Sequence, residues 1–364
     1  MRLRSCFLLA VLLGCVHGLS ADVLYNVTAL GSFLGTASAI NDSGQVTGTI
    51  GGAEAFFYSN GQITRLGPFF SDFGGTYSNG NGINDSGQVT GSSGFPIVGF
   101  FRPFVYSNGQ LVELGTLGGN NSSGRGINNA GQVTGYSSTS VGGFHAFLYS
   151  NGQMADLGTL GGTTSFGYAI NNTGQVTGYS STSGGFFHAF LYGDGQMNDL
   201  GTLGGSSSMG NAINDTGQIT GSASLSSGGE HAFLYSDGQM TDLGTLPGEY
   251  SVSSVGNGIN NRGQVVGSSS AFRPAGISHA FFYSNGYMAD LNDLIDPALG
   301  ITLTGATSIN DQGQIVANSL DLRAYLLTPT PVPEPSTFAL IGVALVGLWA
   351  WSRHCLRTRM PSRS

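Results

Sequence analysis

Residues 145–162 read HAFLYSNGQMADLGTLGG, and this phrase decides the fold because the chain repeats it. Looser or closer copies begin at Glu54, Arg102, His188, His231, His279 and Arg323. Each copy follows a second phrase, Ile-Asn-x-x-Gly-Gln, whose asparagines are Asn41, Asn84, Asn128, Asn171, Asn214, Asn260 and Asn310. The asparagines are 43 to 50 residues apart. Seven units of roughly 40–50 residues fall in the range of propeller blades.

Each unit contains four short strand-like runs separated by turn signals. In the fourth unit these runs are residues 167–170, 175–179, 188–192 and 196–200. The second phrase turns at Asn-Gly or Asp-Gly, which accept positive φ at both central positions of a two-residue hairpin. The first phrase turns at Asn-Asp-Ser-Gly or a variant, which predicts a slightly longer hairpin with a left-handed glycine.

The hairpin register predicts which side chains meet. If Asn151 and Gly152 form a two-residue turn, Phe147 faces Asp156, and His145 becomes the diagonal neighbour of Asp156. The same offset of eleven residues gives the pairs His188/Asp199, His231/Asp242, His279/Asp290, Arg102/Glu113 and Glu54/Arg65. We expect these pairs to stabilise the blades by about 0–1 kcal/mol each. A metal site is not expected, because each unit would supply only one histidine.

The ends of the array indicate how it closes. The last unit stops after its third strand, residues 323–327, while residues 25–31 (YNVTALG) match the fourth strand of other units (QMADLG). We therefore predict an all-β, seven-bladed β-propeller over residues 22–330, with the N-terminal strand completing the last blade and covering its edge. Arg323 is expected to lack an acidic partner, because Ala29 occupies the aspartate position. A parallel β-helix is the alternative architecture.

The amino-acid composition limits the classes of partner that the repeat region can bind. Of 364 residues, 61 are glycine and none is lysine, and the repeat region keeps six arginines against a large excess of acids. An acidic domain of this kind argues against nucleic acid or an anionic membrane as its partner. Cys6, Cys15 and Cys355 all lie outside the repeats, so neither a disulfide nor a cysteine metal site is expected within them.

Residues 1–21 have a basic start, an apolar run over residues 6–16 and small residues at 18–21. This pattern predicts a secretory signal peptide. In the alternative, Leu12-Leu13-Gly14-Cys15 is a lipoprotein cleavage box and Cys15 carries a lipid.

Residues 331–364 form a three-part tail. It contains Val332, Pro333, Glu334 and Pro335, then an apolar run over residues 338–351, then Arg353, Arg357 and Arg359. The run is short against the ~20 residues of a spanning helix, and the arginines would hold its end on the cytoplasmic side.

The tail resembles the PEP-CTERM sorting signal of Gram-negative bacteria that produce exopolysaccharide. The resemblance implies an exosortase-type processing enzyme that recognises Pro-Glu-Pro and removes the tail during surface delivery. The protein would then be transiently anchored in the inner membrane, touching the membrane only through its C-terminal helix, before reaching the cell surface or the medium. An ordinary C-terminal anchor is the alternative.

The units also resemble the HAF repeat of extracellular bacterial proteins, named for its His-Ala-Phe. The matching residues begin at His145, His188, His231 and His279, whereas units one, two and seven lack the histidine. The resemblance implies an extracellular repeat protein and no particular activity.

Longer, variable connections at residues 91–101, 137–144, 269–278 and 292–303 should share one face of the propeller, where binding sites usually lie. In or beside them are Phe95, Ile97, Phe100, Phe101, Phe144, Phe186 and Phe187. These side chains would either form an aromatic platform for sugar rings or pack locally against the blade edges.

The repeats contain few residues in arrangements typical of catalysis or metal binding. Calcium needs several oxygen ligands in one loop, but units three, four and six have Asn-Asn where the others have Asn-Asp, which favours a plain turn. The prominent His, Asp and Asn side chains all belong to the repeat, so we expect no catalytic residue, metal or cofactor. The acids outside the pattern are Asp72, Glu230, Glu249, Asp293 and Asp296.

The expected function is that of an exported, surface-sorted, non-catalytic binding or structural component of the exopolysaccharide or biofilm matrix. Its expected partners are the processing enzyme and extracellular polysaccharide. One alternative is a carbohydrate-active propeller enzyme that uses the variable face, and the other is a surface scaffold for protein interactions.

Overall fold

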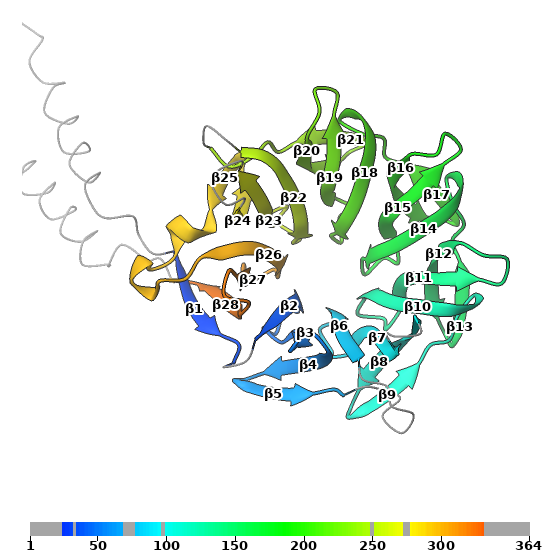
Figure 1. The fold of residues 1–364 in the computed structure, drawn as a ribbon, viewed down its shortest axis with the longest axis horizontal. Helices are drawn as coiled ribbons and strands as arrows, with labels where there is room; N and C mark the ends of the chain where they lie inside the picture. Colours follow the sequence, from blue (N-terminus) through cyan, green and yellow to red (C-terminus); the bar gives the residue numbers. More distant parts are fainter. Residues whose placement is uncertain are drawn as a thin grey trace, which may run out of the picture. The chain divides into compact units, whose positions relative to one another are not determined.

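The computed structural model describes residues 24–31, 34–67, 77–95, 99–247, 251–271 and 277–330. These residues form 28 β-strands and two short 3-10 helices, η3 (Leu291–Leu294) and η4 (Pro297–Leu299). The strands form seven antiparallel groups of four around a central axis, a propeller-like all-β fold (Figure 1). Contacts divide the chain into Met1–Pro329, which holds all the blades, and Thr330–Ser364.

Each blade runs from an inner strand at the axis to an outer strand at the rim (Figure 1). The inner strands are β2 (Gly35–Ile40), β6 (Tyr77–Ile83), β10 (Gly118–Ile127), β14 (Gly161–Ile170), β18 (Gly204–Ile213), β22 (Ser251–Ile259) and β26 (Leu303–Ile309). The second strands are β3 (Val46–Ile50), β7 (Val89–Phe95), β11 (Val133–Thr139), β15 (Val176–Thr182), β19 (Ile219–Leu225), β23 (Val265–Ala271) and β27 (Ile315–Ser319). The third strands are β4 (Glu54–Ser59), β8 (Phe100–Ser107), β12 (Phe144–Ser150), β16 (Phe187–Gly193), β20 (Glu230–Ser236), β24 (Ser278–Ser284) and β28 (Ala324–Pro329). The outer strands are β5 (Gln62–Arg65), β9 (Gln110–Glu113), β13 (Gln153–Asp156), β17 (Gln196–Asp199), β21 (Gln239–Asp242), β25 (Tyr287–Asp290) and β1 (Tyr25–Ala29).

The Ala-Phe of the repeated phrase forms the core between blades. Phe147 is fully buried and packs with Leu114, Ile127 and Val133 in one of seven apolar clusters among the described residues. Burying a phenylalanine of this kind contributes about 1.5–3 kcal/mol. Equivalent phenylalanines are buried at 56, 104, 190, 233 and 281.

The hairpins have the geometry that their turn residues predict. Asn151 has a φ of 52° and Gly152 a φ of 81°, so both central positions are left-handed. Phe147 is then the register partner of Asp156 across β12 and β13.

The inner strand of the fourth blade begins earlier than the sequence predicts. β14 starts at Gly161 rather than at Gly167, because Gly161 pairs with Thr182 of β15 before a register shift ahead of Ser165. Glycine and threonine in a Gly-Gly-Thr-Thr run give a weak strand signal, so the tertiary pairing decides this extension.

The last blade is assembled from both ends of the described chain. β1 pairs antiparallel with β28, with Tyr25 opposite Pro329 and Ala29 opposite Tyr325. The sheet order is β1-β28-β27-β26, so the N-terminal strand supplies the fourth strand that the last repeat lacks. Burial of Tyr25 in this blade raises its pKa to about 12.

The expectation that Arg323 lacks an acidic partner is wrong. Ala29 does leave the aspartate position on β1 without a charge, but the Nε of Arg323 lies 3.3 Å from Oδ2 of Asp321. The tight turn before β28 brings the two side chains together, a local contact that the repeat pattern does not contain.

The predicted signal peptide, residues 1–21, and the predicted tail helix within residues 331–364 lie outside the described residues. Within the described ranges, the chain forms no helix with the length and apolar character needed to traverse a bilayer.

Candidate functional site

A ring of seven buried asparagines surrounds one end of the axis. Each donates its side-chain Nδ2 to the backbone carbonyl of the equivalent asparagine in the next blade. In order, the bonds run from Asn41 to Asn84 (2.8 Å), Asn84 to Asn128 (3.0 Å), Asn128 to Asn171 (3.0 Å), Asn171 to Asn214 (3.1 Å), Asn214 to Asn260 (3.0 Å), Asn260 to Asn310 (3.0 Å) and Asn310 to Asn41 (2.9 Å). The ring thus links all seven blades.

The same asparagines also hold their own turns. Oδ1 of Asn128 accepts from the backbone N–H of Ala130 at 3.1 Å and of Gln132 at 3.0 Å. Nδ2 of Asn128 donates a second time, to Oε1 of Gln132 at 2.8 Å. These bonds explain why asparagine and glutamine recur in the phrase Ile-Asn-x-x-Gly-Gln. Their side chains supply hydrogen-bond partners for the polar groups of a buried turn.

A second ring lies one residue further along each turn. The members are Asp42, Asp85, Asn129, Asn172, Asp215, Asn261 and Asp311, and each Oδ1 accepts a backbone N–H from the neighbouring blade at 2.8–3.0 Å. Burial raises the pKa of Asp42, and the nearby carboxylates Asp311, Asp85 and Asp215 raise it further. The residues that the structure describes contain no group of His, Cys, Asp or Glu arranged to hold a metal ion.

The opposite end of the axis is where the blades differ. Three residues before each ring asparagine, the inner strands carry Ser38, Asn81, Arg125, Tyr168, Asn211, Asn257 and Thr307. These side chains line a cavity of about 370 Å³, within the roughly 300–1,000 Å³ typical of ligand pockets. Side chains that vary in size and charge on a uniform scaffold are typical of a binding surface. We call this cavity the axial cavity.

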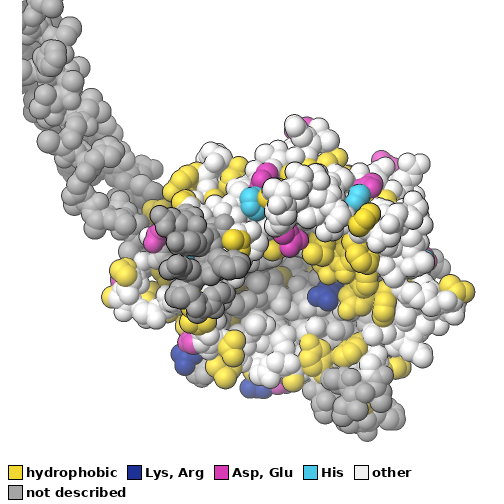
Figure 2. Space-filling view, turned by 45° about the horizontal axis from the view of Figure 1, so that its top comes forward, with side chains coloured by type: hydrophobic (Ala, Val, Ile, Leu, Met, Phe, Trp, Pro, Cys, Tyr) yellow, Lys and Arg dark blue, Asp and Glu magenta, His cyan; other side chains and the backbone are white. Residues whose placement is uncertain are grey.

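Six aromatic rings from the third and fourth blades gather beside the axial cavity. They are Tyr136, Phe144, Phe166, Tyr168, Tyr179 and Phe187, and we call them the aromatic cluster. Phe166 is at its centre, stacked on Tyr179 at 4.9 Å and 5.1 Å from Tyr136. Figure 2 shows hydrophobic side chains collected on one side of a central hollow, with a cationic side chain beside them. Burial raises the pKa of Tyr179 above its usual range, so its hydroxyl stays protonated.

Arg125 lies between this cluster and the axial cavity. Its guanidinium carbon is 5.4 Å from the centroid of the Tyr136 ring and 5.6 Å from that of Tyr168, within the ~6 Å reach of a cation–π contact. Its Nε is the one buried side-chain nitrogen or oxygen without a hydrogen-bond partner in the part of the chain that the structure describes.

The phenylalanines predicted from the sequence are divided between the cluster and its surroundings. Phe144 and Phe187 belong to the cluster, Phe101 packs edge-on against Tyr77 at 5.6 Å, and Phe186 is 54 % exposed. Phe95 and Phe100 are 6.1 Å apart, with Arg102 over the Phe100 ring at 4.0 Å. Ile97 lies outside the described residues.

Sequence reasoning missed the most informative residues of this end, namely Arg125, Tyr136, Phe166, Tyr168 and Tyr179. A signal was present, because Val-Thr-Gly is followed by tyrosine only in units three and four, at Tyr136 and Tyr179. In the other units the same position holds Thr49, Ser92, Ser222, Ser268 and Asn318.

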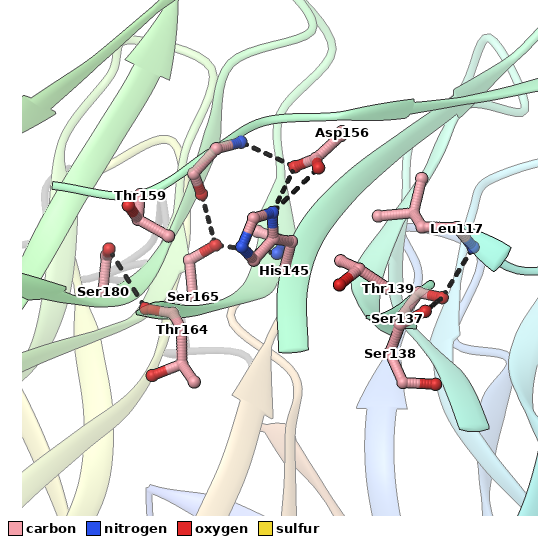
Figure 3. Close-up of polar contacts among 12 residues, drawn as sticks. Leu117, Ser137, Ser138, Thr139, His145, Asp156, Thr159, Thr164, Ser165 and Ser180 are labelled. Atoms are coloured by element: carbon pink, nitrogen blue, oxygen red, sulfur yellow. Dashed lines mark hydrogen bonds and ion pairs between the residues drawn. The ribbon is translucent and has the colours of Figure 1, made fainter. Parts of the chain in front are cut away.

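The histidine–aspartate pairs lie within hydrogen-bonding distance. Nδ1 of His145 is 2.8 Å from Oδ2 of Asp156, and Oδ1 of Asp156 accepts from the backbone N–H of Gly158 at 2.8 Å (Figure 3). The carbonyl of Gly158 accepts from Oγ of Ser165, which in turn accepts from the N–H of Ala146 (Figure 3). The network therefore ties the outer hairpin of the third blade to β14 of the fourth.

The same network recurs with other residues of the repeat. The remaining pairs are His188/Asp199 (2.8 Å), His231/Asp242 (2.9 Å), His279/Asp290 (2.5 Å), Arg102/Glu113 (3.1 Å) and Arg65/Glu54. The hydroxyl of Ser165 is hydrogen-bonded to backbone groups, and so are the hydroxyls of Ser208 and Ser254 in the next two blades. The geometry is that of a structural latch between blades.

The acids outside the repeat pattern have separate environments. Glu230 accepts from Oγ of Ser222 at 2.7 Å, and Asp296 caps η4 by accepting from the N–H of Ala298 at 2.9 Å. Asp293 is exposed in η3. Asp72 and Glu249 lie outside the described residues, as do the sorting residues Val332, Pro333, Glu334 and Pro335 and the arginines Arg353, Arg357 and Arg359.

Two protein-family models match the chain. Residues 198–324 match a family described as a protein of unknown function (DUF3466), and residues 331–353 match the PEP-CTERM protein-sorting motif. The sorting motif marks the protein as exported and sorted to the cell surface or the exterior, with processing by an exosortase. No curated protein sequence matches the chain.

Several solved structures are similar to the chain in fold. A catalytically inactive virginiamycin B lyase from Staphylococcus aureus, solved with quinupristin, matches over 84 % of this chain and 100 % of its own, at 11 % identity and a TM-score of 0.52. YCF48 bound to D1 peptide matches over 85 % of this chain and 96 % of its own, at 11 % identity and a TM-score of 0.48. XC5397, a gluconolactonase from Xanthomonas campestris, matches over 84 % and 90 %, at 10 % identity and a TM-score of 0.44. At such low identity the first of these likenesses shows the propeller-like fold alone.

Proposed function

We propose that this exported protein is a non-catalytic, seven-bladed propeller of the HAF-repeat kind that binds extracellular polysaccharide in the exopolysaccharide matrix. The ligand lies over the axial cavity and the aromatic cluster. The observation that carries the proposal is the position of the departures from the repeat: they gather at the end of the axis that holds Arg125 and the six rings.

The chemistry of this end fits a sugar chain. The C–H faces of sugar rings pack on partly exposed aromatic faces, and Phe187 is 41 % exposed at the rim of the cluster. Asn81, Asn211 and Asn257 line the axial cavity. Each donates one N–H of its side-chain amide to a backbone carbonyl of the next blade, at 2.7–2.9 Å, and its Oδ1 and second N–H can serve the hydroxyl groups of a sugar. The axial cavity is thus mostly polar, with Tyr168 as the one aromatic side chain among the described residues that line it, and the aromatic cluster beside it supplies the apolar surface that ligand sites usually contain.

The non-catalytic role is supported by repetition. The His145–Asp156–Ser165 network recurs at two further blade junctions, whereas a catalytic centre needs its groups assembled once.

The test is co-sedimentation of the purified exported protein with exopolysaccharide from the producing organism, followed over hours for released oligosaccharide. We expect binding without release. The double variant Phe144→Ala/Phe187→Ala should weaken binding at least tenfold. Tyr287→Ala is the matched control, because Tyr287 is 67 % exposed on the outer strand β25. Release of sugar would instead show a carbohydrate-active enzyme, and capture of a protein partner without glycan would favour a scaffold.

A further inference from the structure

The strongest feature that the proposed function leaves unused is the charge of Arg125. Its side chain makes cation–π contacts with Tyr136 and Tyr168, but no ion pair or hydrogen bond with any described residue. We propose that the site selects an anionic glycan and that Arg125 binds a carboxylate carried by one of its sugars. This inference rests on the proposed function and adds the class of ligand to it.

The other described arginines do not compete for this role. Arg65, Arg102 and Arg323 pair with Glu54, Glu113 and Asp321 respectively. Arg262 is exposed in the turn that follows Asn260, at the opposite end of the axis. Arg125 is therefore the single cationic side chain among the residues that line the axial cavity.

The guanidinium has the geometry to receive a carboxylate. A buried N–H without an acceptor is unfavourable, and the Nε of Arg125 is such a group. Among the described residues the guanidinium is held by its contacts with the two tyrosine rings, and we infer that ligand binding turns its Nε–Nη edge toward the cavity. Two parallel N–H groups match the two oxygens of a carboxylate, an arrangement that lysine cannot offer.

The acidic character of the protein weakens the attraction of an anion to this position but does not abolish it. The chain carries a formal net charge of −8, and Asp42, Asp85, Asp215 and Asp311 line a further cavity of about 290 Å³ together with Arg125. Four residues of inner strand separate the level of Arg125 from that of these carboxylates, which corresponds to about 13 Å, so the anion is in contact with Arg125 and distant from them. Salt screens part of the remaining repulsion.

The cavities around Arg125 favour an extended chain over a single sugar. Arg125 also lines a second cavity, of about 200 Å³, with Tyr77, Phe101 and Tyr136. On the far side of the axis, Thr307 and Asn318 line both the axial cavity and a third one of about 390 Å³ between the sixth and seventh blades. The axial cavity thus shares lining residues with both of the others, and we infer that several consecutive sugars bind across them with an acidic one at Arg125.

The experiment compares polygalacturonate with the same polymer after full methyl esterification, which removes the charge and keeps the chain. Affinities of the purified protein are measured by calorimetry at 0.15 M salt. We expect polygalacturonate to bind at least tenfold more tightly than its ester, and trigalacturonate to bind more tightly than galacturonate. Dextran sulfate should bind more weakly than polygalacturonate, and equal binding would overturn the assignment of a carboxylate.

Three variants test whether Arg125 is the residue that gives the preference for the charged polymer. Arg125→Gln should abolish the preference for the charged polymer while the ester still binds, and Arg125→Lys should restore only part of the preference. Arg262→Gln is the control, because it makes the same change of charge at the other end of the axis, and it should leave the preference intact. An unchanged urea midpoint shows that each variant is folded.

Equal binding of the polymer and its ester by the wild type, or an equal effect of Arg262→Gln, would overturn the inference. If native exopolysaccharide binds but is insensitive to Arg125→Gln, the inference fails and the proposed function stands. If no glycan binds, the proposed function fails with it.

Discussion

Asn310 in the last blade donates its side-chain amide to the backbone carbonyl of Asn41 in the first, at 2.9 Å, although 269 residues separate them in the chain. The bond repeats six times between successive blades, but here it joins blades that are far apart in sequence. A second hydrogen bond joins the last blade to the first: the N–H of Asp311 donates to Oδ1 of Asp42 at 2.9 Å.

The first prediction concerns this junction. Asn310→Ala removes two donated bonds, to Asn41 and to Gln314, and one accepted from the Gln314 N–H. The carbonyl of Asn41 still accepts from the N–H of Gly44, but the N–H of Gln314 loses its acceptor. With three hydrogen bonds removed, we expect a loss of about 3 kcal/mol in the free energy of unfolding. Ser43→Ala, in the exposed part of the adjoining turn, should change it by less than about 0.5 kcal/mol. Urea denaturation measures both, and equal stabilities would contradict the role of the ring.

The second prediction concerns the pH dependence of stability. Burial and the neighbouring ring carboxylates raise the pKa of Asp42 above its unfolded value, so the folded state binds more protons in the interval between the two values. Stability should therefore be fully present below about pH 3.9 and fall as pH rises through the folded pKa. Asp42→Asn keeps an oxygen that accepts from the N–H of Asp311, as the amide oxygens of Asn129 and Asn172 accept a backbone N–H at their positions.

At neutral pH and low salt, Asp42→Asn should consequently raise stability by about 0.5 kcal/mol, a value discounted because the side chain is exposed and screened. The dependence on pH should become flatter. Unfolding midpoints from pH 3.5 to 8 test this, with Asp293→Asn as the exposed acid outside the ring. A loss of stability in Asp42→Asn at pH 7 would contradict this account. It would show that the negative charge of Asp42 stabilises the ring, and not only the oxygen that accepts the hydrogen bond.

The third prediction distinguishes two glycines of the fourth blade. A Cβ on Gly178 would lie 1.9 Å from the carbonyl oxygen of Phe166, so Gly178→Ala forces the inner strands apart. We expect it to cost about 3 kcal/mol. A Cβ on Gly193 would meet nothing closer than 3.6 Å, at Cγ of Gln175. Gly193→Ala should be neutral or stabilise by about 0.5 kcal/mol through the unfolded state, and thermal unfolding of both variants checks the contrast.

The fourth prediction concerns the latch between blades. Asp156 accepts from the N–H of Gly158 and is hydrogen-bonded to His145, whereas the side chain of His145 is hydrogen-bonded to Asp156 alone among the described residues (Figure 3). His145→Ala should cost about 0.5–1 kcal/mol, and Asp156→Ala about 1–2 kcal/mol, because it also leaves an N–H without its acceptor. A double-mutant cycle measures the pair, and the outcome against this account is a larger loss in His145→Ala than in Asp156→Ala.

Local spacing carries much of the fold in this sequence. The turn at Asn151 and Gly152 defines which residues of a hairpin face one another, so the closeness of His145 to Asp156 can be predicted from the twelve-residue segment that they bound. The match between residues 25–31 and the fourth strands likewise predicts the pairing of β1 with β28. Both inferences need only a period of two and a known turn.

The axial features could not be predicted in the same way. The amide of Asn128 reaches a carbonyl in another blade, and the repeat alone shows only that the residue belongs to a turn. Arg125, Tyr136 and Tyr168 come from three strands of two blades, and their meeting depends on how the blades are placed around the axis.

The pairing of Tyr25 with Pro329 also has a mechanical consequence. Both exits from the propeller leave the same corner of the last blade, and β28, the strand that leads toward the sorting tail, is flanked by β27 and β1. Tension applied at Thr330 along β28 would load the hydrogen bonds on both sides of the strand together, in shear, instead of opening them one after another. A molecule held by its C-terminal end would thus resist unfolding at β28, the strand that carries the force.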